Sequence, residues 1–206
     1  MIRVTLHDQG VAYDEVHPEW PAAKAPGMAD GSLPFGQLPR FVAEDGTSIV
    51  QSGAIMRYLG RTLGLYGSSP AEAVLVDQCY EEVADFRRAY SKLIYTDSMA
   101  AEPLASYKAG LADRHGRGGY LGHLEAFAKA HGGPFVCGGF LSIADYLLWD
   151  LINTHLREAF MPALFEAYEL PTLQAWYAAM AARPALKAYV ESGASHRAVA
   201  NGNGLA

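Results

Sequence analysis

Patterns typical of β-strands are confined to the first third of this 206-residue chain. After Gly67, apolar residues recur every three or four positions, as in amphipathic helices, and no segment alternates as a strand does. A chain whose strand and helix signals are segregated in this way builds an α+β unit followed by a helical one. We therefore predict two domains, over residues 1–66 and 67–206.

The charge and the distribution of apolar residues argue against nucleic-acid binding and against a membrane span. The net charge is −6, and the 16 lysines and arginines are scattered along the chain. Nucleic-acid binding requires clustered basic residues, so this pattern argues against it. No apolar run approaches the roughly 18 residues of a membrane span, and the N-terminus lacks the apolar core of a signal peptide. These features predict a protein of the cytoplasm with no membrane span.

The cysteines and histidines do not indicate a redox or metal centre. Cys79 and Cys137 lie far apart in the sequence and outside any CxxC motif, which favours two buried free thiols over a dithiol centre or a disulfide scaffold. The seven histidines show no HExxH motif and no paired-ligand spacing. We therefore predict no metal site, and metal-dependent hydrolysis has no support.

The first 36 residues combine a helix, a strand and a loop. Residues 2–10 fit the last turns of an amphipathic helix that stops at Gly10, and residues 11–16 alternate as a strand would. The following residues, 17–36, are rich in Pro, Gly and Ala and predict an irregular surface loop. This order of elements is that of an α+β unit.

The stretch LPRFVAEDGTSIVQS, residues 38–52, is the most specific local pattern. Residues 40–42 and 48–50 fit two strands, and the Asp-Gly pair between them is a hairpin signal. Ser52 is placed to cap a helix that carries one apolar face and ends at Gly64. The stretch therefore predicts a hairpin that leads directly into a helix.

The join between hairpin and helix is suited to a short peptide with a free carboxylate. An exposed Leu38 backbone can pair with an extended ligand, provided that the Leu38–Pro39 bond is cis and turns it outward. The N-terminus of the Ser52 helix offers unpaired N–H groups and a positive dipole to a carboxylate. The alternative is that Pro39 only starts a strand and Ser52 only caps a helix.

The second domain is predicted to be a bundle of helices. A capping box over residues 69–72, with proline at the first helical position, starts a long helix that runs to about residue 95. Ser142 starts another helix with a capping box that Asp145 closes, and we assign Asp145 to folding and not to chemistry. The Ser142 helix is predicted over residues 142–158, and three further helices are predicted over residues 121–131, 173–182 and 185–191.

Several motifs together resemble the pi class of the cytosolic glutathione transferases, over essentially the whole chain. LPxF and QSxAIxRYL indicate the wider superfamily, whereas GRTLGLYG, SKLIYT and the NGNG tail are specific to the class. The resemblance implies a thioredoxin-like domain that holds glutathione as co-substrate, with no cofactor, and an all-helical domain that completes a pocket for small electrophiles. The implied reaction is conjugation of the glutathione thiol to those electrophiles, as in detoxification.

The resemblance also implies which residues contact glutathione. They are Trp20, Lys24, Gln37, Leu38, Pro39, Gln51, Ser52 and Asp85. Leu38 would pair with the cysteinyl backbone, and Gln51 and Ser52 would hold the γ-glutamyl carboxylate. Trp20, Lys24 and Gln37 would contact the glycyl end, although Trp20 is alternatively a loop anchor. Asp85 would reach the γ-glutamyl amine of the glutathione in the partner subunit, since a carboxylate suits an ammonium group.

Further positions are implied to line the electrophile pocket or a dimer interface. Tyr95 matches the tyrosine that donates a hydrogen bond in the pocket, and the alternative is an ordinary tyrosine at a helix end. Phe35 matches the aromatic key that inserts into the other subunit, so a homodimer is expected. Arg57, Arg61 and Asp77 would add charge pairs across the interface, unless they are only solvated.

No catalytic residue is assigned within the chain. A hydrogen-bond donor activates glutathione because it lowers the pKa of the thiol and populates the nucleophilic thiolate. In the pi class this donor is a tyrosine at the end of the first strand, which by the resemblance falls upstream of Met1. The expected fold is therefore an α+β thioredoxin-like domain that lacks its first strand, followed by an all-α helical bundle, and we expect the native chain to be longer.

Two other functions were weighed against conjugation. One is a catalytically impaired dimeric protein that binds glutathione or hydrophobic ligands, which would follow if the tyrosine is absent. The other is a thiol–disulfide oxidoreductase, which shares the thioredoxin-like domain but requires a reactive cysteine near the first helix. No cysteine precedes Cys79, so the oxidoreductase is disfavoured.

Overall fold

The computed structural model describes residues 1–157 and 160–193. In this part of the chain, ten helices accompany two short strands. The elements of the first domain are α1 (Ile2–Asp8), α2 (Lys24–Ala29), β1 (Arg40–Val42), β2 (Ser48–Val50) and α3 (Ser52–Thr62). Those that follow are α4 (Pro70–Tyr95), α5 (Ala101–Ala112), α6 (Tyr120–His131), α7 (Ile143–His155), α8 (Leu164–Ala167), α9 (Pro171–Ala181) and α10 (Pro184–Glu191). The class-specific NGNG tail lies outside the described residues.

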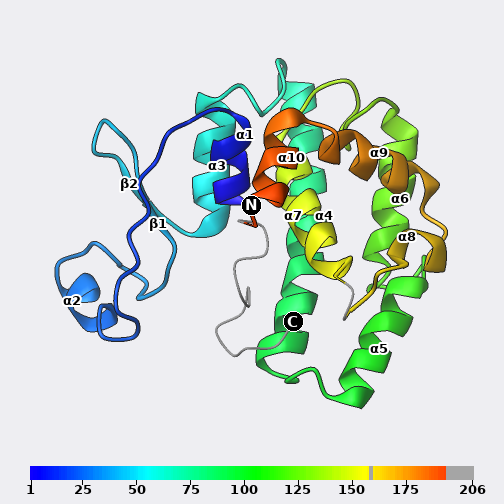
Figure 1. The fold of residues 1–206 in the computed structure, drawn as a ribbon, viewed down its shortest axis with the longest axis horizontal. Coiled ribbons are helices and arrows are strands. Elements are labelled where there is room, and N and C mark those ends of the chain that lie inside the picture. The colour runs from blue at the N-terminus through cyan, green and yellow to red at the C-terminus, as the bar shows by residue number, and fades with distance from the viewer. Residues whose placement is uncertain (158–159, 194–206) are drawn as a thin grey trace.

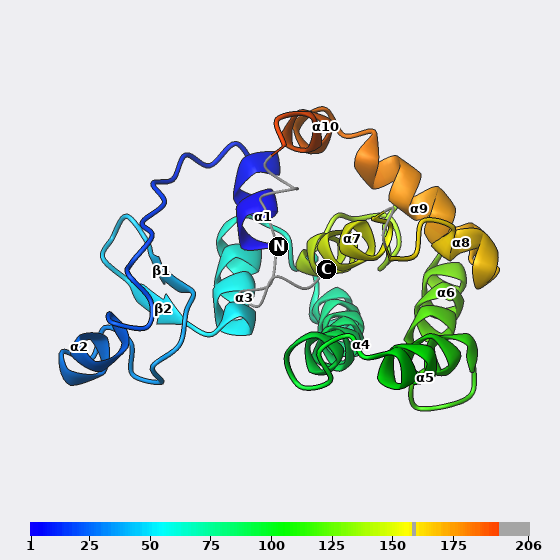
Figure 2. The same ribbon diagram turned by 60° about the horizontal axis from the view of Figure 1, so that its bottom comes forward.

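The molecule is elongated, with the hairpin and α2 at one end and the helices from α4 to α9 at the other (Figure 1). Helices α1 and α3 lie between these two ends, where α1 contacts α10 and α7, and α3 contacts α7 (Figure 2). The helical bundle is built around α4 and α7, which pack against each other. The first and last helices of the described chain are therefore neighbours.

The core follows from the apolar spacing of α4 and α7. On α4, Val76, Cys79, Val83 and Phe86 recur every three or four residues and are all buried. Helix α7 is buried along nearly its whole length, which fits its largely apolar sequence IADYLLWDLI. Burial of these side chains is the main source of stability of the bundle, at roughly 1.5–3 kcal/mol for each large apolar side chain.

The predicted hairpin is confirmed. Strands β1 and β2 pair antiparallel, with Phe41 opposite Ile49. In the turn, the Asp45 carboxylate accepts a hydrogen bond from the Thr47 N–H at 2.8 Å, and Gly46 has a positive φ of 86°. A glycine at such a φ carries no steric cost, which is why the Asp-Gly pair is a reliable hairpin signal.

Three predictions in the first domain were wrong in detail. Residues 11–16 do not form a strand, because β1 and β2 are hydrogen-bonded only to each other in the described chain and leave this segment no ladder to join. The predicted loop over residues 17–36 contains the short helix α2. Ser52 is not the N-cap of α3 but its first helical residue, since the preceding Gln51 has the positive φ of 72° that sets the helix start.

The helical predictions are largely confirmed. The helix at Ser142 has the expected capping box, although α7 ends at His155, and Glu158 lies outside the described residues. At the start of α4, Ser69 accepts from the Glu72 N–H as predicted, but the Glu72 carboxylate bonds to Ser68 instead of closing the box. Helix α5 was not predicted, because it has no capping side chain and its sequence AEPLASYKAGLA contains both Pro and Gly.

The Asp145 side chain ties three parts of the helical domain together. One carboxylate oxygen accepts from the Val136 N–H and from the Trp176 indole N–H, each at 2.8 Å. The other accepts from the N–H and the hydroxyl of Ser142, also at 2.8 Å. Burial raises the pKa of Asp145 and these four hydrogen bonds oppose the shift. The predicted folding role of Asp145 thus extends from α7 to α9.

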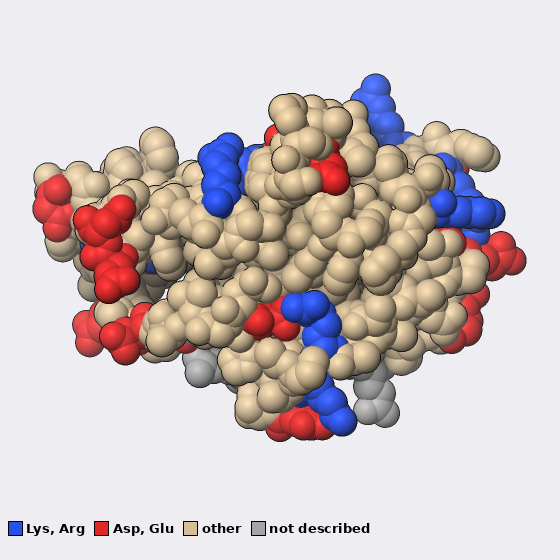
Figure 3. Space-filling model, turned by 90° about the horizontal axis from the view of Figure 1, so that it is seen from above, with Lys and Arg blue, Asp and Glu red and all other residues tan. Residues whose placement is uncertain are grey.

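Charged side chains are spread over the surface. On the face seen in Figure 3, lysines and arginines form separate groups around a largely uncharged centre. No described helix is long and apolar enough to cross a bilayer.

Candidate functional site

The loop that precedes β1 has the backbone geometry on which the predicted ligand site depends. The Leu38–Pro39 peptide bond is cis, as the prediction required. Leu38 is 43% exposed, although it is a large apolar residue. An apolar side chain at such a place packs against little of the protein itself. Leu38 therefore lies at the surface, next to the cis bond that the proposed pairing with an extended ligand requires.

The N-terminus of α3 begins immediately after β2. The Gln51 carbonyl accepts the first helical hydrogen bond, from the Ile55 N–H at 3.0 Å, and no side chain caps the helix. The N–H groups of the first turn have no partner within an α-helix, and they point along its positive dipole end. Because α3 is anchored by buried residues such as Met56, this end is held in place. It is a suitable seat for a carboxylate.

Gln37, Gln51 and Lys24 lie around the same point. The Gln51 side-chain N–H donates to the Gln37 side-chain oxygen at 3.3 Å, so the cis-proline loop and the α3 N-terminus are neighbours. The Lys24 side chain lies over Gly36, since a Cβ built on Gly36 would stand 2.8 Å from Lys24 Cε. The structure thus brings together Gln37, Leu38, Pro39, Gln51 and Ser52, with Lys24 beside them.

This arrangement offers a ligand three kinds of contact. The Leu38 backbone can pair with an extended chain, the α3 N-terminus can hold a carboxylate, and the Lys24 ammonium can meet a second carboxylate. A short peptide that carries a carboxylate at each end matches this set. Trp20 lies in the preceding loop, 47% exposed and next to a second cis peptide bond, Trp20–Pro21.

Two predicted residues of α4 lie apart from this cluster. Asp85 forms an ion pair with Arg88 one helical turn further on, and not with a residue of the cluster. Tyr95 is the last residue of α4 and is 57% exposed. Their predicted roles depend on a partner subunit and on a bound electrophile, so both roles stay predictions.

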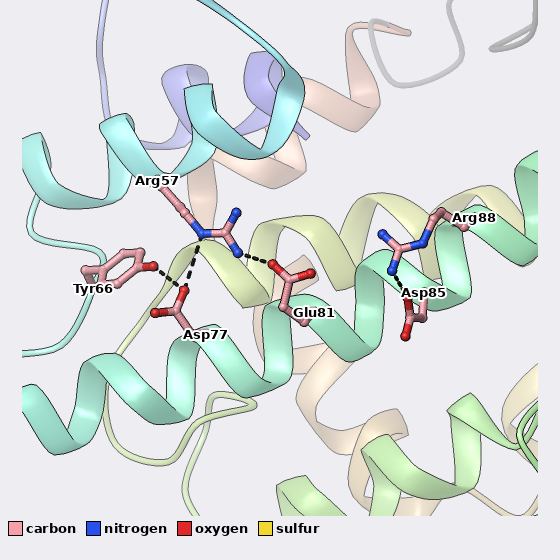
Figure 4. A network of polar contacts seen from close by, with 6 residues as sticks. All are labelled: Arg57, Tyr66, Asp77, Glu81, Asp85 and Arg88. Carbon is pink, nitrogen blue, oxygen red and sulfur yellow. Dashed lines mark hydrogen bonds and ion pairs between the residues drawn. The ribbon is translucent and has the colours of Figure 1, made fainter.

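The charged residues predicted for a dimer interface form a cluster within the chain. Arg57 of α3 donates to Asp77 at 3.3 Å and to Glu81, and the Tyr66 hydroxyl also donates to Asp77 (Figure 4). Burial alone would lower the pKa of Arg57, but hydrogen bonds to Glu81, Tyr66 and Asp77 raise it. Arg57 therefore stays charged and joins α3 to α4.

The other two residues predicted for the interface are exposed. Arg61, one turn beyond Arg57, lies over the Tyr66 ring at 5.4 Å. Phe35 is 62% exposed, which is unusual for a phenylalanine that has no partner outside the protein. Whether Phe35, Arg57, Arg61 and Asp77 contact a second subunit stays a prediction.

Some residues of these clusters were missed in the sequence. Glu81 completes the Arg57 cluster, and its signal was the spacing of four that places Asp77, Glu81 and Asp85 on one face of α4. Cys79 and Cys137 are both buried, as predicted, but the structure places Cys137 against the turn of α4 that precedes Cys79. Sequence separation gave no signal for that contact. Within the described ranges, no group of three or more His, Cys, Asp or Glu is arranged to hold a metal.

Two family profiles match the chain. The one described as "Glutathione S-transferase, N-terminal domain" matches residues 1–61, and "Glutathione S-transferase, C-terminal domain" matches residues 84–193. The predicted order of a thioredoxin-like domain and a helical domain is thereby confirmed. The two matches leave the predicted boundary at residues 66 and 67 untested.

Named relatives cover nearly the whole chain. "Glutathione S-transferase P" of Pongo abelii is 37% identical over an alignment of 206 positions that covers 98% of this chain and 91% of that protein. "Glutathione S-transferase P 10" of Caenorhabditis elegans is 35% identical and covers 92% of this chain and 84% of its own. Among solved structures, the pi-class glutathione S-transferase of Onchocerca volvulus superposes with a TM-score of 0.81 at 27% identity, covering 100% of this chain and 92% of that one. The chain belongs to the glutathione S-transferase family.

Proposed function

We propose that this protein conjugates glutathione, through its thiol, to small hydrophobic electrophiles. The observation that carries the proposal is the junction of the cis Leu38–Pro39 loop with the open N-terminus of α3, joined by the hydrogen bond between Gln37 and Gln51. Glutathione is a short extended peptide with a carboxylate at each end, so it matches both halves of this junction. Pi-class names among the relatives support the same conclusion.

Binding follows from these contacts. The cysteinyl backbone of glutathione pairs with Leu38, which fixes the direction of the thiol. The γ-glutamyl carboxylate lies at the α3 N-terminus, where Gln51 and Ser52 add side-chain hydrogen bonds to the free N–H groups. Lys24, Gln37 and Trp20 contact the glycyl carboxylate. Tyr95 borders the pocket for the electrophile.

The enzyme is proposed to act as a homodimer in the cytoplasm. Phe35 supplies the exposed aromatic anchor, and the α3–α4 surface with Arg57, Arg61 and Asp77 surrounds it on the partner. Asp85 of one subunit then reaches the γ-glutamyl amine of the glutathione held by the other. Two free buried cysteines are typical of a protein from a reducing compartment.

The site is tested by titrating glutathione by calorimetry and by following its conjugation to a chlorodinitrobenzene. Ser52→Ala removes a charge-assisted hydrogen bond to the carboxylate, so we expect KM for glutathione to rise about 10- to 100-fold with little change in kcat. Thr62→Ala, at the opposite end of α3, is the matched control and should leave KM unchanged. Equal effects of the two substitutions would contradict the placement.

The same experiment separates the two functional classes. Saturable glutathione binding together with turnover supports the transferase. Saturable binding without turnover would favour a glutathione-binding protein that lacks thiolate activation. If glutathione does not bind, both proposals fail.

The dimer is tested separately by sedimentation. Phe35→Ala should shift the protein towards monomer, because it removes the aromatic anchor. Val16→Ala is the control, since Val16 is an exposed apolar residue, 83% accessible, that no proposed interface includes. A stable dimer of Phe35→Ala would remove Phe35 from the interface.

A further inference from the structure

Cys79 and Cys137 meet in the interior of the helical domain, away from the Gln37–Ser52 junction. Cys79 lies on the buried face of α4, and Cys137 lies in the connection between α6 and α7. The two residues are only 1% and 2% exposed. The Cys137 thiol donates to the Leu75 carbonyl oxygen at 3.7 Å, and Leu75 lies one helical turn before Cys79. Cys137 is therefore fixed against the turn of α4 that carries Cys79.

The two thiols lie near each other, because Leu75 and Cys79 occupy successive turns of α4 and Cys137 is bound to the first of them. Interaction with Cys137, followed by burial, raises the pKa of the Cys79 thiol, and the nearby Asp145 and Glu82 carboxylates act in the same direction. The neighbours Val76 and Val136 are fully buried. The Ser142 hydroxyl lies 4.0 Å from the Cys137 sulfur. Two buried thiols on facing segments of a close-packed core are candidates for a bond between their sulfurs.

We propose that Cys79 and Cys137 form a reversible disulfide within the chain when the protein meets a hydroperoxide, and that this bond fastens the α6–α7 connection to α4. The proposal concerns a modification site and does not depend on glutathione transfer. A transient, redox-dependent disulfide is the kind found in reducing compartments.

The chemistry requires only the two thiols and a peroxide. We assign the first step to Cys137, because it lies in a loop that opens more easily than the middle of a helix. Its thiol loses a proton, the thiolate attacks one peroxide oxygen and the O–O bond breaks. A sulfenic acid forms, and the departing hydroxide takes up the released proton as water. The Cys79 sulfur then attacks the Cys137 sulfur and displaces hydroxide, which takes the Cys79 proton and leaves as water. Two thiols are oxidised to one disulfide while one hydrogen peroxide is reduced to two waters.

The burial of the two thiols determines how fast they are oxidised and which oxidants reach them. Since the Cys79 thiol is buried and its pKa is raised, the pair is protected from large electrophiles and large disulfides. A small neutral hydroperoxide reaches it when the connection opens. Because the second sulfur is held nearby, the sulfenic acid is captured as a disulfide before it is oxidised further.

Oxidation should stabilise the protein. The bond would close a loop that runs from α4 to the start of α7 and would reduce the conformational freedom of the unfolded chain. For a loop of this length, in a chain of this size, we expect Tm to rise by about 5–15 °C on oxidation and to return on reduction. Glutathione binding should be unchanged, because the junction at α3 is not part of the loop.

The test uses the full chain, reduced, freed of reductant and treated with increasing hydrogen peroxide. Samples are then unfolded, alkylated with iodoacetamide and weighed intact. Because the chain contains only two cysteines, any disulfide within one chain joins Cys79 to Cys137. We expect a product that is two hydrogen atoms lighter, takes no alkyl group, yields the linked peptide on digestion and is reversed by dithiothreitol.

Other products would overturn the proposal. These are two alkylated cysteines after peroxide treatment, a sulfinic or sulfonic acid on either cysteine, or a disulfide between chains. Cys79→Val and Cys137→Val are the control variants, and in each the peroxide-dependent rise in Tm should vanish. Mass analysis of the unsubstituted protein decides the question even where a variant fails to fold.

Discussion

His155 makes the stability of the bundle depend on pH. It is fully buried at the C-terminal end of α7, with the rings of Tyr90 and Phe86 at 4.7 and 4.9 Å. Its Nδ1 lies 2.7 Å from the Leu151 carbonyl oxygen, which can only accept, so Nδ1 carries the proton. Nε2 then accepts from the Tyr107 hydroxyl, also at 2.7 Å. The site is built for a neutral imidazole.

The size of the effect follows from the pKa. Burial lowers the pKa of His155 to about 4, whereas an unfolded histidine titrates near 6.5. Protons therefore bind the unfolded chain more strongly than the folded one. The contribution of neutral His155 to folding stability is fully present above pH 6.5 and is lost as the pH falls towards 4. From these two pKa values, the free energy of unfolding should fall by about 2 kcal/mol between pH 7.5 and pH 5, and by about 3 kcal/mol once His155 is protonated in both states.

Urea unfolding at pH 7.5 and pH 5 measures this loss directly. His155→Asn should be less stable at pH 7.5, because the aromatic packing is lost, but it should lose about 2 kcal/mol less than the unsubstituted protein on acidification. His17→Gln is the control, since the His17 side chain is 70% exposed and should keep the full pH dependence. The reasoning is refuted if the unsubstituted protein is equally stable at both pH values, or if His155→Asn keeps the whole dependence.

Three further substitutions test the buried polar contacts of the fold. Asp145→Ala leaves backbone N–H groups and the Trp176 indole N–H without an acceptor, so urea unfolding should show a loss of about 3–5 kcal/mol. Asp8→Ala removes the acceptor of Tyr146 and Arg183 and should cost about 2–4 kcal/mol; a double-mutant cycle with Arg183→Met should show positive coupling. Glu125→Ala uncaps α9, because its carboxylate accepts from two N–H groups of the first turn at 2.9 and 2.8 Å; amide exchange in that turn should accelerate, at a cost of about 1–2 kcal/mol.

Elements that local chemistry defines were predictable from the sequence. The hairpin depends on one Asp-Gly turn, and α4 and α7 depend on a serine cap followed by apolar residues every three or four positions. Each of these signals lies within a few residues of the element that it starts. The prediction therefore needed no knowledge of the tertiary contacts.

Elements that depend on a neighbour were not predictable. Residues 11–16 alternate as a strand would, but alternation cannot supply the adjacent strand that a ladder requires. The start of α3 was displaced by one residue because the positive φ of Gln51 is uncommon for a residue other than glycine. Helix α5 has weak local signals and is held by packing against α4 and α6.

The candidate ligand site and the cysteine pair differ in the same way, since the first depends on local sequence and the second on tertiary packing. Leu38 and the α3 N-terminus could be proposed from the sequence because they would act through the backbone, whose direction is set by Pro39 and by the start of the helix. The approach of Cys137 to the turn of α4 that precedes Cys79 depends on the packing of two distant segments, so no local pattern indicates it. The residues of the first kind of site all lie within residues 1–61, which the N-terminal family profile matches. A contact that arises from a particular pair of residues has to be found in the structure of the particular chain.

The proposed peptide site joins two elements that differ in how firmly they are held: the loop and hairpin that follow Leu38, and helix α3. Each strand of the hairpin has only three residues, and most of their side chains are exposed or half-buried. The firm element is α3, whose Ile55 and Met56 are completely buried and which packs against α7. A ligand that bridges the Leu38 backbone and the α3 N-terminus would therefore connect a weakly held hairpin to the core. Such a ligand stabilises the folded state more strongly the more tightly it binds. The resulting protection from hydrogen exchange should increase most in the amides of β1 and the preceding loop.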